Sequence, residues 1–314
     1  MPTSPLPPCI QQLIDTIRQH EQLTPSLARH LLTASEITAD DLLPWSTFDH
    51  PKEDSYGRKL VECGGYFELM VMSWVDGDMS AIHDHGHTQW GAVKLFGPAN
   101  HALFQIRQGQ LTTLSRTVCP AGTVVGVDHQ MIHQMGNVGH SPFLTLHLYG
   151  ADGFDKDVTA DARLYELDEG TIQFTSGGVF FDLPEDKINR REPAPSADFP
   201  TTLRHKTELC NRHMQRYPDY AERGSISARA NRLVQEQFSL SFWEPLYHEV
   251  EQMKSQGQKT YECYRAILHQ ELVAAAILQQ RVVDAGLMEP ASALPAVLLQ
   301  NRITEDSWQS IATV

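Results

Sequence analysis

Apolar residues recur at helical spacing near the start of the chain. One apolar stripe contains Ile10, Leu13, Ile14 and Ile17, and a second contains Leu27, Leu31 and Leu32. The pair Thr24-Pro25 indicates a helix start, because proline is favoured at the first helical position. We therefore expect residues 1–50 to form a helical segment that packs on the next part of the chain.

From about residue 56 to residue 181 the pattern changes to short alternating runs. Glycine-containing turns such as Asp76-Gly77 and Gly97-Pro98 separate them. The candidate strands are 67–74, 91–96, 101–106, 111–116, 123–127 and 144–149. Regularly spaced short strands predict an all-β barrel or sandwich, here over residues 51–182.

The last part of the chain reads as helical again. Residues 183–200 are polar and contain four prolines, which predicts a linker. Beyond it, 225–255 and 259–285 carry apolar residues at helical spacing, and Gly286 suits the end of the second helix. Residues 201–314 are thus expected to be α-helical. Their role stays open between oligomerisation, covering a barrel mouth and recognising a carrier.

Composition narrows the location and the partners. No apolar run approaches the length of a membrane span, and the Pro-rich start does not resemble a signal peptide, so we expect a cytoplasmic protein without a membrane partner. The five cysteines are scattered and form no C-x-x-C pair, which argues against a disulfide framework or a zinc finger. A net charge of −14 disfavours nucleic acid as a partner.

The most informative histidines stand in Gly77-Asp-Met-Ser-Ala-Ile-His83-Asp-His85, with Gly97 downstream. Two histidines one residue apart on a strand point to the same face, so both can reach one ion. A third donor has to come from another strand, and the segment that begins at His133 and ends at Asn137 supplies it. The two segments resemble the cupin motifs, G-x5-H-x-H and a distant H-x3-N. We therefore expect a mainly β cupin, a small β-barrel or jelly-roll, with a metal bound by the three histidines.

No fourth ligand is evident. The glutamate that follows the H-x-H pair in ordinary cupins is replaced by Trp90, which cannot ligate, and Gln89 beside it is a poor substitute. Three neutral histidines leave other coordination positions open, where O2 and a substrate can meet on a redox metal. Histidine sites accept iron, nickel, zinc and copper, so the ligand set alone does not identify the metal.

Residues around these motifs resemble the cysteine dioxygenases, the thiol dioxygenases of the cupin superfamily. The resemblance covers about residues 56 to 150. It includes Tyr56-Gly-Arg58, Ser80-Ala-Ile-His83-Asp-His85 and Thr145-Leu-His147-Leu-Tyr149. An upstream Y-x-R, the three ligands and a downstream H-x-Y appear in the family's order, which makes the match specific.

The resemblance implies one Fe(II) per chain on the three histidines, with a cysteine-like thiol and O2 as the reacting partners. It implies that Arg58 holds the substrate carboxylate in a charge-assisted pair. Tyr149 would present its hydroxyl to the substrate or to O2, oriented by His147. Tyr56, Met72 and Trp90 would complete the substrate pocket. Taken alone, His147 and Tyr149 on one strand face are as easily barrel packing, and Arg58 a surface residue.

One departure from the family concerns the pocket. The animal enzymes have a cysteine at the position aligned with Trp90, and it crosslinks to the active-site tyrosine. Trp90 cannot form that thioether, so Tyr149 is expected to be unmodified and the pocket narrower or reshaped. Related mercaptopropionate dioxygenases typically lack the arginine, so Arg58 favours L-cysteine as substrate.

We therefore predict a non-haem iron(II) thiol dioxygenase that converts L-cysteine and O2 to cysteine sulfinate. One alternative is an oxygenase that acts on another cysteine-derived thiol in a specialised biosynthetic pathway. The other is a cupin that binds a metal or small ligand without turnover. A homo-oligomer formed through the C-terminal helices is compatible with each of these.

Overall fold

The computed structural model describes residues 5–198 except 21, 53, 138, 152–156 and 182, and beyond them 201–202, 204–205, 208–209, 212, 248, 250–258, 262, 265–266 and 268. The chain divides into two compact units, Met1–Ala197 and Asp198–Val314. In the second unit the described residues are mainly helical, but most of the helices predicted at 225–255 and 259–285 lie outside the described residues. No helix within the described part of the chain is long and apolar enough to span a membrane.

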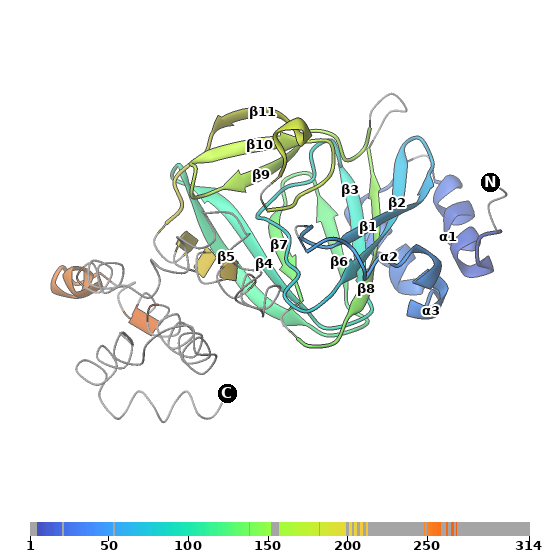
Figure 1. The fold of residues 1–314 in the computed structure, drawn as a ribbon, viewed down its shortest axis with the longest axis horizontal. Coiled ribbons are helices and arrows are strands. Elements are labelled where there is room, and N and C mark those ends of the chain that lie inside the picture. The colour runs from blue at the N-terminus through green and yellow to red at the C-terminus, as the bar shows by residue number, and fades with distance from the viewer. Residues whose placement is uncertain are drawn as a thin grey trace. The chain divides into compact units, whose positions relative to one another are not determined.

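The first unit begins with helices and continues as an antiparallel β structure (Figure 1). The helical elements are α1 (Pro8–Arg18), α2 (Pro25–Ala34), α3 (Ala39–Leu42) and the 3-10 turn η1 (Leu43–Trp45). The strands are β1 (Gly57–Cys63), β2 (Phe67–Trp74), β3 (Trp90–Leu95), β4 (Ala99–Arg107), β5 (Gln110–Cys119), β6 (Val124–Asp128), β7 (Ile132–Gly136), β8 (Phe143–Gly150), β9 (Ala162–Glu166), β10 (Thr171–Thr175) and β11 (Ile188–Pro193). The helical lead and the six predicted strands are confirmed to within a few residues.

Three sheets form the barrel. Their strand orders are β1-β2-β8-β3-β6, β5-β4-β7 and β11-β10-β9, with antiparallel pairing throughout. The fold is the predicted cupin type, mainly β with N-terminal helices. The second and third sheets share an apolar core that includes Phe104, Ile132, Tyr165 and Phe174.

Helix α2 begins where the sequence predicts. The Thr24 hydroxyl accepts a hydrogen bond from the backbone N–H of Leu27 at 3.2 Å, and Pro25 opens the helix. Such a cap satisfies a backbone donor that would otherwise lack an intrahelical partner. The apolar stripes of α1 and α2 then pack, in one buried cluster, against the five-stranded sheet.

Strand β8 contacts the helices with one face and the barrel interior with the other. All eight of its residues are buried. Leu144, Leu146 and Leu148 belong to the helix-covered cluster, and the alternate residues therefore point into the barrel. Those alternate residues are Thr145, His147 and Tyr149, so the apolar positions of β8 anchor a row of polar groups in the interior.

The segment predicted as a linker is part of the barrel. Strand β11 lies within 183–200 and pairs with β10. Ser196 accepts a backbone hydrogen bond from Leu111 at 2.9 Å, which ties the end of the segment to β5. The linker interpretation is therefore wrong for this stretch. Strand β11 is an exposed edge strand with Pro193 at its last position, a place where a missing N–H does not interrupt a ladder.

Candidate metal centre and active site

Three buried histidines converge in one pocket. His83 and His85 lie in the irregular segment between β2 and β3, and His133 lies on β7. His83 and His133 exchange two backbone hydrogen bonds, of 2.9 and 2.8 Å, which places their side chains next to each other. One ring nitrogen from each of the three histidines lies within 4.8 Å of the others. The sequence-predicted ligands are thus brought together, although His83 and His85 stand on a bridged segment and not on a regular strand.

His83 is held in the tautomer that a metal ligand needs. Its Nδ1 lies 2.8 Å from the carbonyl oxygen of Ala81, which can only accept, so Nδ1 carries the proton. Burial lowers the pKa of His83 to about 4, so the ring is neutral at pH 7. Its Nε2 therefore carries a lone pair, which faces the ring of His133 with 3.1 Å between the two Nε2 atoms.

His85 has two buried ring nitrogens, and neither has a hydrogen-bond partner among the described residues. A buried polar group without a partner costs about 1–3 kcal/mol, so such groups call for an explanation. Burial also lowers the pKa of His85 well below its usual value, which excludes a buried imidazolium at neutral pH. A metal ion at the centre of the three histidines would satisfy one of its nitrogens. The residues present therefore fit a divalent metal of the kind that imidazole ligands favour.

Among the described residues, no carboxylate or thiolate joins the three histidines as a further potential ligand. Three neutral imidazoles would not offset the positive charge of a bound metal, and they would leave coordination positions open toward the pocket. That pocket is also lined by residues that include Tyr56, Arg58, Met70, Met72, Trp74, His147 and Tyr149. The catalytic candidates and two of the predicted substrate contacts, Tyr56 and Met72, therefore surround the histidines.

A chain of hydrogen bonds leads from Trp74 through β8 to the pocket. The indole N–H of Trp74 donates to Thr145 Oγ1 at 2.9 Å. Thr145 Oγ1 lies 2.7 Å from His147 Nε2, and His147 Nδ1 lies 2.7 Å from the Tyr149 hydroxyl. The Tyr149 ring in turn stands 5.2 Å from the ring of His85. The hydroxyl of Tyr149 is therefore connected to an interior relay next to the metal centre.

Trp74 sets the direction of this relay. An indole N–H can only donate, so Thr145 Oγ1 accepts from it. Thr145 is fully buried, and His147 Nε2 is the acceptor available to its own hydroxyl proton among the described residues. Burial and the nearby Arg58 charge lower the pKa of His147 to about 3, so the neutral ring carries its proton on Nδ1. That proton is donated to Tyr149, and the Tyr149 O–H is left to donate into the pocket.

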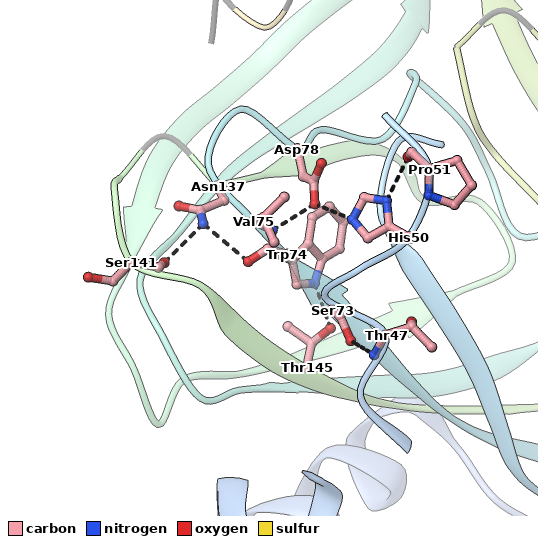
Figure 2. A network of polar contacts seen from close by, with 10 residues as sticks. All are labelled: Thr47, His50, Pro51, Ser73, Trp74, Val75, Asp78, Asn137, Ser141 and Thr145. Carbon is pink, nitrogen blue, oxygen red and sulfur yellow. Dashed lines mark hydrogen bonds and ion pairs between the residues drawn. The ribbon is translucent and has the colours of Figure 1, made fainter. Parts of the chain in front are cut away.

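A second polar network fixes the position of Trp74 (Figure 2). The Asn137 side-chain amide donates to the carbonyl oxygens of Trp74, at 3.3 Å, and of Ser141, at 3.0 Å. The buried Asp78 accepts from the backbone N–H of Val75 at 2.7 Å and lies 2.9 Å from His50 Nε2. The asparagine of the H-x3-N motif is thus a framework residue that holds the turn after Trp74, not a ligand.

Arg58 enters the pocket from β1. Its Nη2 donates to Thr159 Oγ1 at 3.4 Å, while its buried Nε has no partner among the described residues. Thr159 Oγ1 in turn donates to Glu68 Oε2 at 3.2 Å. Burial, followed by the charge of Asp157, raises the pKa of Glu68, and the Arg58 charge opposes that effect. The guanidinium thus keeps donor capacity that an anionic ligand group can use.

Trp90 does not take the position expected for it. It is buried in the helix-covered cluster and is absent from the residues that line the pocket. In the β3–β8 pair, Trp90 is opposite Gly150, and Gly91 is opposite Tyr149. Paired residues share a face, so Gly91 and not Trp90 borders Tyr149. The predicted substrate contact of Trp90, and a pocket narrowed by its indole, are therefore wrong.

Other pocket residues were missed from the sequence. Met70, Ser80, Asp84 and Thr159 also line the pocket, and none of them was predicted as a site residue. Asp84 stands between two of the predicted ligands, and its buried carboxylate forms an ion pair with the partly exposed Arg163, so it anchors the H-x-H segment to β9. For Met70 a signal existed, because it alternates with Met72 on one strand. Thr159 is linked to the site through contacts with residues far away in the sequence, Glu68 and Arg58, which are 91 and 101 residues away.

Comparison with known proteins bears on this arrangement. The sequence model of the family described as cysteine dioxygenase type I matches residues 2–155. These residues belong to that family. The match includes the three histidines, Arg58 and Tyr149. Dioxygenases are oxidoreductases, so the match to this family indicates an oxidoreductase.

Relatives of known function agree with this membership. The chain is 28% identical over 156 residues to cysteine dioxygenase type 1 of Danio rerio, which covers 46% of this chain and 75% of that protein. It is 27% identical over 147 residues to the human cysteine dioxygenase type 1, which covers 45% of this chain and 73% of the relative. Among solved structures, a cupin 2 conserved barrel domain protein from Salinispora arenicola is similar at 15% identity and a TM-score of 0.26, over 32% of this chain and 79% of that one. A likeness at this TM-score carries no information on function.

Proposed function

We propose that the protein is an iron(II)-dependent thiol dioxygenase that converts L-cysteine and O2 to cysteine sulfinate. One observation carries the proposal: three buried histidines converge in a pocket that also contains the Arg58 guanidinium and the Tyr149 hydroxyl. In the proposed reaction the thiol S–H is replaced by a sulfinic acid, and both atoms of O2 end on sulfur. No external reductant is needed, because sulfur supplies all four electrons that O2 accepts.

The histidines His83, His85 and His133 would hold the iron. Bound there, iron(II) would supply the redox chemistry that lets O2 react with a thiolate. The neutral state of all three rings supports this role, because burial lowers the pKa of each ring. A ligand set without a carboxylate leaves more positive charge on the ion, which favours an anionic sulfur ligand.

Arg58 is proposed to bind the substrate carboxylate. Its Nε is buried without a partner among the residues that the structure describes, and a carboxylate is the group that a guanidinium binds in a two-point, planar contact. Tyr56 and Met72 line the same pocket and would contact the carbon skeleton of the substrate. A cysteine-like molecule, with a carboxylate two bonds from the carbon that bears sulfur, would thus be held at both ends.

Tyr149 is proposed to donate its hydroxyl proton to an oxygen atom or to the substrate in the pocket. The relay from Trp74 through Thr145 and His147 supports that direction of donation. Burial also raises the pKa of Tyr149, so the hydroxyl stays protonated throughout the neutral range. Tyr149 is therefore a hydrogen-bond donor at rest rather than a base.

The direct test is O2 uptake by the iron(II)-loaded protein after addition of L-cysteine, with the product identified by mass spectrometry. We expect consumption of one O2 per thiol and a product heavier by two oxygen atoms. The variant His133→Ala should lose metal and activity together. Retention of full iron stoichiometry in that variant would contradict the ligand assignment. Iron-loaded protein that leaves L-cysteine unchanged would contradict the proposed substrate.

A second candidate is dioxygenation of a different cysteine-derived thiol. The family match ends at residue 155, and the unit Asp198–Val314 lies beyond it. A panel of cysteine derivatives in the same uptake assay separates the candidates, because a preferred derivative would show a higher kcat/KM than L-cysteine. The cytoplasmic location and the homo-oligomer through the C-terminal helices stay predictions.

A further inference from the structure

A fourth histidine stands directly behind the metal-binding group. His101 lies on β4, next to β7, and is only 6% exposed. Its Nε2 is 2.9 Å from Nδ1 of His133, and the two rings meet edge to face, with 5.1 Å between their centroids. His101 is therefore in hydrogen-bond contact with a proposed ligand, on the side of the ring that faces away from the other two ligands.

Three contacts made by ring nitrogens of His83, His133 and His101 restrict which of these nitrogens can carry a proton. His83 carries its proton on Nδ1, so its Nε2 can only accept. His133 Nε2 lies 3.1 Å from that nitrogen. As a hydrogen bond, this contact requires a proton on His133 Nε2, and His133 Nδ1 must then accept from His101. A metal ligand needs the reverse arrangement, because its Nε2 has to offer a lone pair.

We propose that His101 is a positioning residue of the metal centre: it accepts the hydrogen bond from His133 Nδ1 and so fixes the tautomer and ring orientation in which His133 binds iron. This inference rests on the proposed metal centre and extends it. In this form the neutral His133 carries its one proton on Nδ1 and the neutral His101 carries its one proton on its own Nδ1, so the Nε2 lone pair of His101 accepts the hydrogen bond from His133. A partner of this kind also raises the basicity of the ligand.

The three proposed ligands differ in what supports them. His83 donates to a backbone carbonyl, which only accepts, so its tautomer is fixed with or without metal. The two ring nitrogens of His85 have no hydrogen-bond partner among the described residues. His133 contacts another imidazole, whose nitrogen can donate or accept. That imidazole is only 6% exposed, and the unprotonated nitrogen of its neutral form can accept a hydrogen bond. His133 is thus the ligand whose metal-binding form depends on a side chain.

Two substitutions separate hydrogen bonding from packing. His101→Phe keeps an aromatic ring in the buried site but removes the acceptor. His101→Gln is smaller in bulk but can place its amide oxygen as an acceptor near His133. The matched control is His140→Gln, since His140 is 83% exposed on its side chain and contacts Asp76 rather than a ligand.

The first measurement is the affinity for Co²⁺, determined by competition with a chelator, since affinity does not depend on turnover. We expect His101→Phe to weaken binding by about 10–100-fold, the range typical of lost outer partners of metal ligands. His101→Gln should recover most of the affinity, and His140→Gln should match the parent. Unchanged affinity in His101→Phe would overturn the inference. A parent protein that fails to bind Co²⁺ would instead overturn the proposed metal centre.

A second measurement needs no variant and so does not depend on folding of a substituted chain. In ¹⁵N-labelled, Zn²⁺-loaded protein, the proton of His133 should reside on Nδ1 and show a scalar coupling across the hydrogen bond to His101 Nε2. Detection of that coupling supports the positioning role. A proton on His101 Nε2 pointing at His133, or a His133 ring bound through Nδ1, would overturn it.

Discussion

The indole N–H of Trp74 donates to the hydroxyl of Thr145 at 2.9 Å, and this contact fixes the direction of every later hydrogen bond toward Tyr149. Trp74 itself is held by stacking on Tyr56, with ring centroids 4.8 Å apart, and by Asn137 at its carbonyl (Figure 2). Trp74 thus lines the pocket with its ring and also determines, through Thr145, which ring nitrogen of His147 carries the proton. Its substitution should therefore affect catalysis more than binding.

We expect Trp74→Phe to lower kcat by about 10-fold or more while iron content and KM change little, because the relay supplies part of a proton-transfer contribution of about 10²–10⁴. Thr145→Val should show the same pattern, whereas Thr145→Ser should keep most of the activity. The measurement is steady-state O2 uptake with iron quantified in each sample. Parental kcat in Thr145→Val would show that the hydroxyl has no part in orienting His147.

Gly91 offers a test of the corrected pocket. A Cβ at this position would lie 2.5 Å from the carbonyl oxygen of Leu148 and 2.9 Å from Tyr149 Cδ1. Since the first of these is backbone, the β3–β8 pairing has to open, and we expect Gly91→Ala to reduce the free energy of unfolding by about 1–3 kcal/mol. Activity should fall as well, because Tyr149 is displaced. Urea unfolding and O2 uptake measure the two effects.

Gly126 is the matched control for that substitution. It also lies in a strand, β6, but a Cβ there would find its nearest neighbour at 3.5 Å, an ordinary contact. Gly126→Ala should therefore be neutral or raise stability by about 0.5–1 kcal/mol, the usual difference between the two residues in a strand. Equal losses in both variants would mean that the close approach of Tyr149 to Gly91 has no energetic consequence.

Much of this architecture could be predicted from local pattern. The strand alternation, the H-x-H pair and the Thr24 cap all depend on residues close in sequence. Each can therefore be recognised from a short stretch of sequence. Trp90 shows where such reasoning fails. The spacing from His85 aligned it with a pocket residue, but a shift of one residue in a strand exchanges its two faces. Only the pairing of Gly91 with Tyr149 decides which face is which.

The contacts that join distant segments could not be predicted. His101 is separated from His133 by 32 residues and belongs to no motif, so nothing in the sequence distinguishes it from the other histidines. Strand β11 was misread for a related reason. Its exposed, charged, proline-flanked sequence resembles a linker, and its β structure comes from pairing with β10 rather than from its own pattern.

Arg58 should contribute through substrate binding. We expect Arg58→Gln to raise KM for L-cysteine by about 10–150-fold, because a hydrogen bond to a charged group is worth about 1.5–3 kcal/mol. Arg58→Lys should be intermediate, since an ammonium group lacks the planar fork. Iron content should not change. The neighbouring Lys59→Gln is the control, because Lys59 is exposed on the same strand.

A thiol that lacks a carboxylate tests whether Arg58 acts through the substrate carboxylate. With cysteamine in place of cysteine, Arg58→Gln should cost little, since the group that the guanidinium binds is missing from the ligand. Competition binding to the iron-loaded protein measures both thiols on one scale. The same loss of affinity for cysteine and for cysteamine would mean that Arg58 supports the pocket in another way and does not bind the carboxylate.

The buried histidines should make the metal-free protein sensitive to acid. Burial lowers the pKa of His83 and His101 to about 4 and, with the Arg58 charge, that of His147 to about 3. In the unfolded chain these rings have a pKa of about 6.5, so below that pH the unfolded state binds more protons. Stability is therefore full above about pH 6.5 and is lost as the pH falls toward about 4. Each histidine contributes a slope of up to about 1.4 kcal/mol per pH unit in that window.

Urea unfolding in EDTA at pH 7, 6 and 5 measures this slope directly. We expect the midpoint to fall at each step, most steeply between pH 6 and 5, where the unfolded histidines have become charged. His101→Gln should reduce the slope of the free energy of unfolding against pH by the contribution of one histidine. A free energy of unfolding that is constant from pH 7 to pH 5 would contradict the neutral, buried state on which both the ligand set and the relay depend.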